Sequence, residues 1–259
     1  MISLRRVLVT GAASGIGQAA ATLLRERGDE VLGVDKQGSD VDADLSTPEG
    51  RSRAVAAAQE RWDALDAVLA CAGLSDPSTL TVRVNFFGVT ELLSGLRPLL
   101  AESAAPRAAV VGSVSGTHSL DDRLVDACLD GDEDEAARLA GTIAEGDRAH
   151  TIYSSSKAAL ARWVRRTCVR PGWADAGIPL NAVAPGTVRT PLSDFVFSDP
   201  ELRELMDKFV PMPLNGYADP EVIARCLLWL ISADNTHVTG QIVYVDGGAE
   251  VTTRGDTRW

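Results

Sequence analysis

Tyr153 and Lys157 form the residue pair best suited to proton transfer in this sequence. They stand at positions i and i+4 of a stretch predicted to be helical over 153–169, which would place both side chains on one helix face. An ammonium group beside a phenol favours the phenolate and lowers the phenol pKa from its usual value of about 10. Such a phenol can give a proton to a ketone or take one from an alcohol. Alone, the spacing is weak evidence, because most such pairs are exposed helix neighbours.

Polar residues from three other segments could join this pair. Ser113 follows a predicted strand over 108–112, at the strand end where open α/β sheets bind their ligands. Asn85 lies in a helix-like stretch, where a buried amide either finds hydrogen-bond partners or simply bends the helix. The segment 185–190 follows another strand and carries hydroxyl groups that could bind a carboxamide. These segments together predict a site for a carbonyl or alcohol group.

A glycine-rich segment, Thr10-Gly11-Ala12-Ala13-Ser14-Gly15-Ile16-Gly17, joins a predicted strand over 6–10 to a predicted helix over 16–27. Gly11 would allow a sharp turn, and Gly15 and Gly17 would let the backbone approach a diphosphate. The helix N-terminus would offer unpaired N–H groups to the phosphates. A lone glycine motif is weak evidence, but a strand before it and a helix after it are the context that a dinucleotide site requires.

The choice of dinucleotide depends on Asp35, which ends a predicted strand over 30–35 and lies 18 residues after Gly17. A carboxylate there can accept hydrogen bonds from both ribose hydroxyls of NAD and would repel the 2′-phosphate of NADP. Lys36 follows at once, but Ser14, not a basic residue, precedes Gly15. The sequence therefore favours NAD over NADP.

Two further segments are placed to meet the adenosine half of a dinucleotide. Asp44, followed by Leu45, would either contact the adenine or serve as an acid at the entry of the next helix. A predicted strand over 67–71 ends at Cys71, and the small residues Ala72 and Gly73 follow it. These small residues would let the backbone run beneath the adenosine.

The spacing of apolar segments predicts the fold that would position these residues. Short apolar strands alternate with helices, and the strands lack polar alternation, so the sheet is expected to be covered on both faces. This pattern predicts a single α/β domain over 1–259, with a Rossmann-type, doubly wound parallel sheet. Thr47 would cap a helix that begins at Pro48. The remaining predicted elements are a strand over 180–184, a helix over 89–100, a helix over 220–231 and a last strand over 241–245.

Composition excludes several classes of function. The 259 residues carry a net charge of −11, which argues against nucleic acid or an anionic membrane surface as partner. No apolar run reaches the roughly 18 residues of a membrane span, and the N-terminus has no signal-peptide pattern. The cysteines are scattered, which predicts no disulfide framework, no metal site and a reducing cytoplasm; they are Cys71, Cys128, Cys168 and Cys226.

Taken together, these residues resemble the short-chain dehydrogenase/reductase family over essentially the whole chain. The matching positions are Thr10–Gly17, Asp35, Asp44-Leu45, Asn85, Ser113, Tyr153, Lys157, Pro185-Gly186 and Asp246-Gly247-Gly248.

The resemblance implies an NAD(H)-dependent oxidoreductase that interconverts a secondary alcohol and a ketone. Tyr153 would be the general acid and base, Ser113 would bond the substrate oxygen, and Lys157 would tune Tyr153 and bind the nicotinamide ribose. Asn85 would hold a water in the proton path, and Thr190 would hold the carboxamide. The residues expected to bind the cofactor are Gly11, Ser14, Gly15, Ile16, Gly17, Asp35, Asp44, Leu45, Cys71, Ala72, Gly73, Tyr153, Lys157, Pro185, Gly186, Val188 and Thr190.

The chain departs from the family pattern at two places. The usual Asn-Asn-Ala-Gly is Ala70-Cys71-Ala72-Gly73 here, which would loosen the support of that strand end. Tyr153 follows Ser113 by 40 residues, a far longer gap than most of the family has. The extra residues form an acidic insertion, 118–149, in which ten acids and three arginines give a net charge of −7. Its apolar spacing suggests helix.

A bacterial branch of the family that acts on 3α-hydroxysteroids and carbonyl compounds carries a similar insertion. There the insertion covers a surface that relatives use to form tetramers, so the resemblance implies a homodimer through the late helix and the last strand. The plainer alternative is that the insertion is a solvated surface segment without a role in the chemistry.

The segment 190–217, the expected substrate lid, is richer in apolar residues than a solvated loop should be. It could close over a hydrophobic ketone, or these residues could pack on the sheet or at a dimer contact. Other substrates remain open: a monoterpene alcohol, an aryl ketone or a cyclic diol. A non-catalytic nucleotide-sensing scaffold is the alternative from another class, although intact Ser113, Tyr153 and Lys157 count against it.

Overall fold

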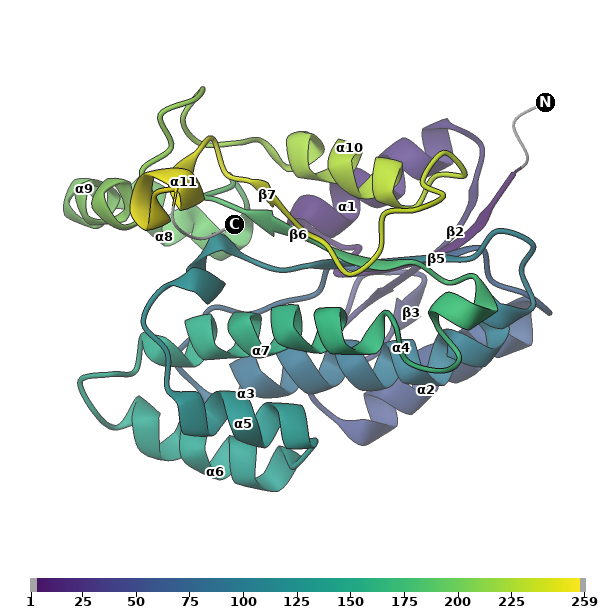
Figure 1. Cartoon of the computed structure of the whole chain (residues 1–259), viewed down its shortest axis with the longest axis horizontal. Coiled ribbons are helices and arrows are strands. Elements are labelled where there is room, and N and C mark those ends of the chain that lie inside the picture. Colours follow the sequence, from purple (N-terminus) through teal and green to yellow (C-terminus); the bar gives the residue numbers. More distant parts are fainter. Residues whose placement is uncertain (1–3, 257–259) are drawn as a thin grey trace.

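The computed structural model describes residues 4–256, and its centre is one seven-stranded sheet in which every pair of neighbours is parallel (Figure 1). The strand order is β3-β2-β1-β4-β5-β6-β7, so the direction of winding reverses between β1 and β4. Ligands of doubly wound sheets bind at such a reversal, beyond the carboxyl ends of the strands. The strands are β1 (Arg6–Thr10), β2 (Glu30–Asp35), β3 (Val41–Asp42), β4 (Ala67–Ala70), β5 (Arg107–Val111), β6 (Leu180–Pro185) and β7 (Ile242–Val245).

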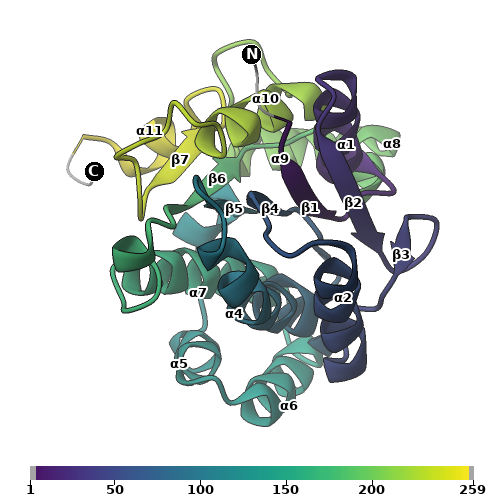
Figure 2. The same cartoon turned by 90° about the vertical axis from the view of Figure 1, so that its right-hand side faces the viewer.

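Helices cover both faces of the sheet, as the apolar strands require (Figure 2). One layer holds α1 (Gly15–Glu26) and α10 (Pro220–Leu230). The opposite layer holds α2 (Pro48–Arg61), α3 (Thr79–Val82), α4 (Gly88–Ala101) and α7 (Thr151–Thr167). Each layer has its own apolar core against the sheet. The predicted Rossmann-type architecture is confirmed, and no helix within residues 4–256 is long and apolar enough to cross a membrane.

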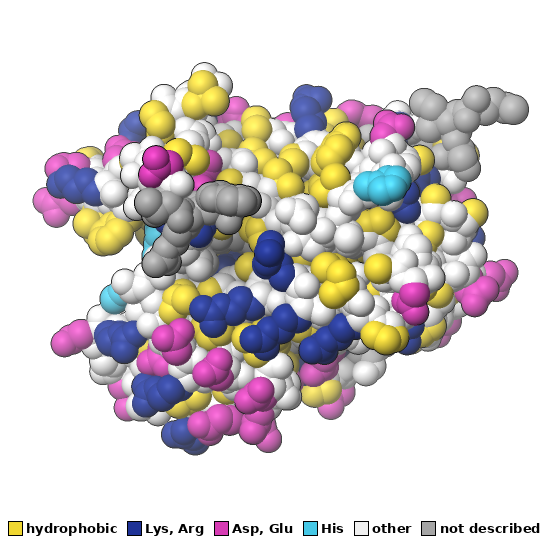
Figure 3. Space-filling view, viewed as in Figure 1, with side chains coloured by type: hydrophobic (Ala, Val, Ile, Leu, Met, Phe, Trp, Pro, Cys, Tyr) yellow, Lys and Arg dark blue, Asp and Glu magenta, His cyan; other side chains and the backbone are white. Residues whose placement is uncertain are grey.

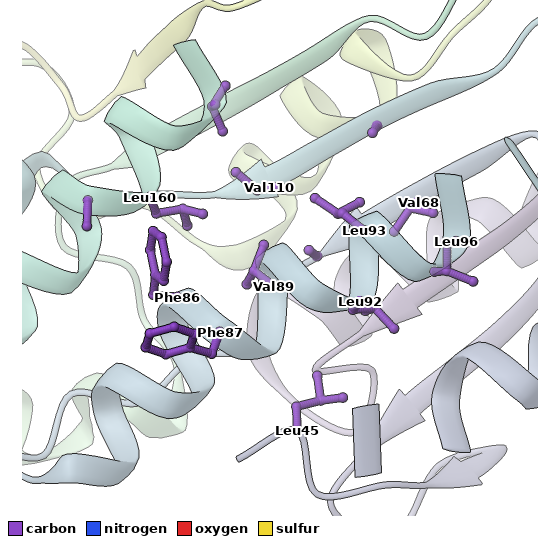
Figure 4. Close-up of a cluster of buried hydrophobic side chains, with 14 of the residues drawn as sticks. Leu45, Val68, Phe86, Phe87, Val89, Leu92, Leu93, Leu96, Val110 and Leu160 are labelled. Carbon is purple, nitrogen blue, oxygen red and sulfur yellow. The ribbon is translucent and has the colours of Figure 1, made fainter. Parts of the chain in front are cut away.

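The larger core lies between α4, α7 and the sheet. Phe86 and Phe87 pack edge to face, with ring centroids 5.1 Å apart, and lie near Leu160 of α7 (Figure 4). They belong to a π-helical turn, Arg83–Phe87, that joins α3 to α4. The sequence predicted only a helix-like stretch here, because a π-turn leaves no distinct apolar period.

Local capping signals were read correctly. The Thr47 hydroxyl accepts a hydrogen bond from the Gly50 N–H at 3.1 Å, and Pro48 is the first residue of α2. Predicted and observed ends of the strands and helices differ by one or two residues, which is the usual scatter of element ends.

The acidic insertion forms two helices, α5 (Asp122–Asp130) and α6 (Glu133–Ala144), in a further layer outside α7 and α3 (Figure 2). It is not a solvated segment, because its apolar faces join the main core. Asp121 is 4% exposed, and the other acids of the insertion are exposed or half-buried. The buried apolar residues are Leu124, Val125, Ala127, Cys128, Ala136, Leu139, Ala140 and Ile143.

Candidate active site

A cavity of about 560 Å³ opens at the carboxyl ends of the central strands. Figure 3 shows the surface indented on its left side, between the side chains over α9 and those over α7. Every residue expected to bind cofactor or act in catalysis lines this cavity, except Asn85. Part of the lining could not be predicted from the sequence, because no motif marks these residues: Gln37, Ala43, Leu74, Ser75 and Leu80.

The glycine-rich turn is shaped for a diphosphate. Gly11 has φ of +68°, and a Cβ there would lie 2.9 Å from the Ala72 nitrogen. A Cβ at Gly17 would overlap the Gly11 carbonyl oxygen and lie 2.6 Å from its carbonyl carbon. Ser14, the N-cap of α1, makes no side-chain capping bond, which leaves the first N–H groups of α1 to a ligand. These features fit a dinucleotide.

Asp35 lines the cavity beside the glycine-rich turn and is held in place by the backbone. Its Oδ2 accepts a hydrogen bond from the Ala13 N–H at 3.0 Å, and its Oδ1 accepts one from the Lys36 N–H at 2.7 Å. The side chain of Lys36 turns away to pair with Asp44, with 3.1 Å between Nζ and Oδ2. The cation next to Asp35 is therefore already neutralised.

The position of Asp44 is compatible with both of its predicted roles, a contact to the adenine and an acid at the entry of the next helix. It lines the cavity, and its Oδ1 accepts hydrogen bonds from the hydroxyl of Ser46 at 2.6 Å and from the Ser46 N–H at 3.0 Å. The Ser46 hydroxyl is the main cause that lowers the pKa of Asp44, so the carboxylate is charged at neutral pH.

The end of β4 is better supported than the sequence suggested. The Thr10 hydroxyl accepts hydrogen bonds from the N–H groups of Cys71 and Ala72, both at 3.1 Å. This hydroxyl holds the strand end that the missing amide side chains were expected to hold. Burial raises the pKa of Cys71 to about 12, so its thiol stays neutral.

Tyr153 and Lys157 project from α7 toward Ser113 at the end of β5. The Lys157 ammonium lies 5.9 Å from the centroid of the Tyr153 ring and donates a hydrogen bond to the Val111 carbonyl at 2.9 Å. Burial lowers the pKa of Lys157 to about 8. The Ser113 oxygen accepts a hydrogen bond from the Ser115 N–H at 3.1 Å, and the Ser113 hydroxyl also hydrogen-bonds with the Tyr153 phenol.

The expected lowering of the Tyr153 pKa is not observed. Burial raises the pKa of Tyr153, and the hydrogen bond with Ser113 offsets this only in part. Lys157 does not counter the burial, because it bonds to Val111 and not to the phenol. Tyr153 is therefore a protonated phenol at neutral pH, ready to act as an acid.

Asn85 is fully buried and braces the loop after β4. Its Nδ2 donates to the Leu74 carbonyl at 2.9 Å and to the Ser156 hydroxyl at 3.1 Å, while its Oδ1 accepts from the Leu74 N–H at 2.8 Å. Both amide protons are thus engaged. A water held by Asn85 would therefore have to donate to its Oδ1 or to its main-chain carbonyl.

The segment 190–217 forms α8 (Asp194–Ser198) and α9 (Pro200–Phe209) beside the mouth of the cavity. Val196 and Val210 are buried, but Phe195 is 51% and Phe209 59% exposed, so packing on the sheet does not account for the segment. The Thr190 N–H donates to the Ser193 hydroxyl at 3.1 Å at the start of this segment. Apolar side chains of this segment line the cavity: Leu192, Phe195, Val196, Met206 and Val210.

Comparisons with known proteins agree with this geometry. A family model described as short chain dehydrogenase matches residues 5–123, and one described as enoyl-(acyl carrier protein) reductase matches residues 137–250. The break between the two matches falls inside the acidic insertion.

Relatives and solved structures cover nearly the whole chain. A 3-alpha-hydroxysteroid dehydrogenase/carbonyl reductase of Comamonas testosteroni is 34% identical over 96% of this chain and 97% of its own. A 3beta-hydroxysteroid dehydrogenase 1 of Eggerthella lenta is 28% identical over 94% and 93%. The structure of the 3-alpha-hydroxysteroid dehydrogenase from Pseudomonas sp. B-0831 complexed with NADH is 38% identical, covers 97% and 99%, and has a TM-score of 0.89.

Proposed function

The chain belongs to the short-chain dehydrogenase/reductase family, and we propose that it interconverts a hydrophobic secondary alcohol and its ketone with NAD(H). The family makes it an oxidoreductase of CH–OH groups that uses a nicotinamide dinucleotide. The observation that carries the proposal is one cavity lined by Asp35 and the glycine turn, by Ser113, Tyr153 and Lys157, and by apolar side chains of the segment 190–217.

The chain's own residues account for the proton. When bound, the nicotinamide supplies or accepts a hydride. Tyr153, kept protonated by burial, gives its proton to the carbonyl oxygen during reduction and takes it back during oxidation. The Ser113 hydroxyl, once it donates to the substrate oxygen, stabilises the charge that develops there. Lys157, with a pKa of about 8, holds and releases a proton beside the phenol.

We propose a bulky substrate of the 3-hydroxysteroid or 3-ketosteroid class. Two of the similar relatives are named for hydroxysteroids, and the apolar wall formed by α8 and α9 suits a large hydrophobic ring system. The test is NADH oxidation with a panel of a 3-ketosteroid, a monoterpene ketone, an aryl ketone and a cyclic diketone. Turnover of small polar ketones alone would contradict the substrate class. Bound NADH without turnover of any ketone would favour the nucleotide-sensing scaffold.

The proposed preference for NAD rests on Asp35 and on the pairing of Lys36 with Asp44. The Asp44→Asn substitution removes the negative charge that pairs with Lys36, so the Lys36 ammonium is free to bind a 2′-phosphate. Because the Lys36–Asp44 pair is largely exposed, it is worth about 0.2–1 kcal/mol, so we expect kcat/KM with NADPH to rise by up to about fivefold. Steady-state kinetics with both cofactors measure this change.

Asp42→Asn is the matched control, because Asp42 is exposed and forms no ion pair with the described residues. Its NADPH kinetics should equal those of the wild type. A wild type that already prefers NADPH would overturn the assignment of Asp35.

The proposed assembly is a homodimer through α10 and β7. β7 is the free edge of the sheet, and Val222 and Trp229 of α10 are each 48% exposed nearby. The acidic insertion occupies the outer face of α7. Four free thiols are consistent with a reducing compartment, and we propose the cytoplasm.

Trp229→Arg is expected to convert the dimer to a monomer, because a charge would be buried at the centre of the contact. Light scattering of the purified protein measures the mass. Gln59→Arg is the control, since Gln59 is exposed on α2, in the helix layer on the opposite face of the sheet from α10, and should leave the dimer intact. A wild-type tetramer would show that the insertion does not block the second interface.

A further inference from the structure

Ser113 and Tyr153 lie on separate elements, and the acidic insertion stands between them in the sequence. The segment after Ser113 forms a short 3-10 helix, η2 (Val114–Thr117), that packs directly against α7. A Cβ at Gly116 would lie 3.1 Å from the Ala158 nitrogen and 3.2 Å from the Lys157 carbonyl carbon. The backbone of the Ser113 segment is thus in close contact with the catalytic helix.

Two buried hydrogen bonds fix this contact just beyond η2. The Ser154 hydroxyl donates to the Ser119 carbonyl at 2.6 Å, and the Ser155 hydroxyl accepts from the Asp121 N–H at 2.9 Å. Ser154 is 5% exposed and Ser155 is fully buried. Both serines directly follow Tyr153 in α7, so they join the catalytic helix to the segment that carries Ser113.

The same contact is tied to the acidic insertion. The Asp121 carboxylate accepts hydrogen bonds from the N–H groups of Arg123 and Leu124 and so begins α5. α5 then packs along α7. Asp121 therefore connects three elements. It follows η2 in the chain, it begins α5 of the insertion, and its N–H bonds to Ser155 of the helix that carries Tyr153.

We propose that Ser154 and Ser155 are positioning residues that hold Ser113 in register with Tyr153. This proposal rests on the proposed function of the Ser113, Tyr153 and Lys157 site. Neither serine lines the cavity, so neither touches the reacting atoms. Loss of the Ser155 hydroxyl would leave the Asp121 N–H buried without a partner, and the segment would move to satisfy it. A displacement of about 1 Å of a catalytic group can cost a hundredfold in rate.

The contact also predicts a change in the pH dependence. The hydrogen bond with Ser113 lowers the pKa of Tyr153 against the effect of burial. When Ser113 moves away, that pKa rises further, so alcohol oxidation needs a higher pH to reach its plateau. A residue that only stabilised the fold would not move this pH limb.

The test compares Ser154→Ala and Ser155→Ala with Thr142→Ala, whose hydroxyl bonds only within α6, to the Arg138 carbonyl at 3.1 Å. We expect kcat to fall about tenfold in each serine variant, with the dissociation constant for NADH unchanged. The rise of the alcohol oxidation rate with pH should occur at a higher pH than in the wild type. Thr142→Ala should match the wild type. Thermal unfolding and NADH titration establish that each variant is folded, and Ser154→Ala serves if Ser155→Ala does not fold.

A double-mutant cycle with Ser113→Ala separates this role from a general one. Because the serines act through Ser113, Ser155→Ala should cost little further activity once Ser113 is replaced. Additive losses, an unmoved pH limb or weaker NADH binding would overturn the positioning role alone. A folded wild type that binds NADH but reduces no ketone would overturn the proposed function, and this proposal with it.

Discussion

Tyr153→Phe is expected to lower kcat for ketone reduction by about 10²–10⁴-fold, the range that a positioned general acid contributes. Phenylalanine keeps the ring that packs beneath Lys157 and removes only the hydroxyl next to Ser113. The NADH dissociation constant, measured by fluorescence titration, should therefore remain within about twofold, a change under 1 kcal/mol.

The pH dependence of the two reaction directions also follows from the Tyr153 pKa. Because burial raises the pKa of Tyr153, wild-type ketone reduction should persist through neutral pH and fall as the pH rises through that pKa. Alcohol oxidation should rise over the same range, since it needs the phenolate. In the phenylalanine variant both changes should disappear. A variant that retains wild-type turnover would show that another group supplies the proton.

Gly17→Ala is expected to weaken NADH binding by roughly a hundredfold, about 2.7 kcal/mol. The added methyl group would overlap the carbonyl oxygen of Gly11, and both atoms belong to backbone that cannot rotate away. Either the turn or the N-terminus of α1 must shift, and the N–H groups then no longer converge on a diphosphate. Isothermal titration with NADH measures the loss.

Gly141→Ala is the matched control, because a Cβ there meets nothing closer than 3.7 Å, the Thr79 methyl. Alanine also favours a helix interior, so this variant should be as stable as the wild type or slightly more so. Wild-type NADH affinity in Gly17→Ala would show that the diphosphate does not bind at this turn.

The nucleotide end of the site could be predicted from the sequence because its signals are local. Within thirty positions the chain has a strand, the glycines from Gly11 to Gly17, a helix and the acid Asp35. Each of these features is needed at its place for a dinucleotide to bind. The strands could be predicted for a similar reason, since short apolar runs such as Ala67–Ala70 have few other uses in a chain of this composition.

The properties that the sequence could not provide depend on contacts between distant segments. The pKa of Tyr153 was predicted to fall, because Lys157 is its sequence neighbour; it rises, because burial dominates and Val111 takes the ammonium. Asn85 stays a predicted member of the proton path, but the sequence could not show that its amide protons bond to Leu74 and Ser156. A pattern of residue types does not reveal which neighbours compete for a hydrogen bond.

The role of the serines between Tyr153 and Lys157 was hidden for the same reason. In the sequence these serines show no property beyond membership of a helical stretch. In the structure, Ser154 bonds to Ser119 and Ser155 bonds to Asp121, both at the start of the acidic insertion. That insertion, and not the catalytic pair, is what the chain adds to the family pattern.

The most direct test of the central claim is the fate of hydrogen during one reaction. The wild-type protein is incubated with a ketone and with NADH that carries deuterium at both hydride positions, and the product is analysed by mass spectrometry. The account predicts one deuterium on the carbinol carbon of the alcohol and a hydroxyl proton from Tyr153 that exchanges with water. Alcohol without deuterium, or no alcohol from any ketone while NADH remains bound, would contradict it.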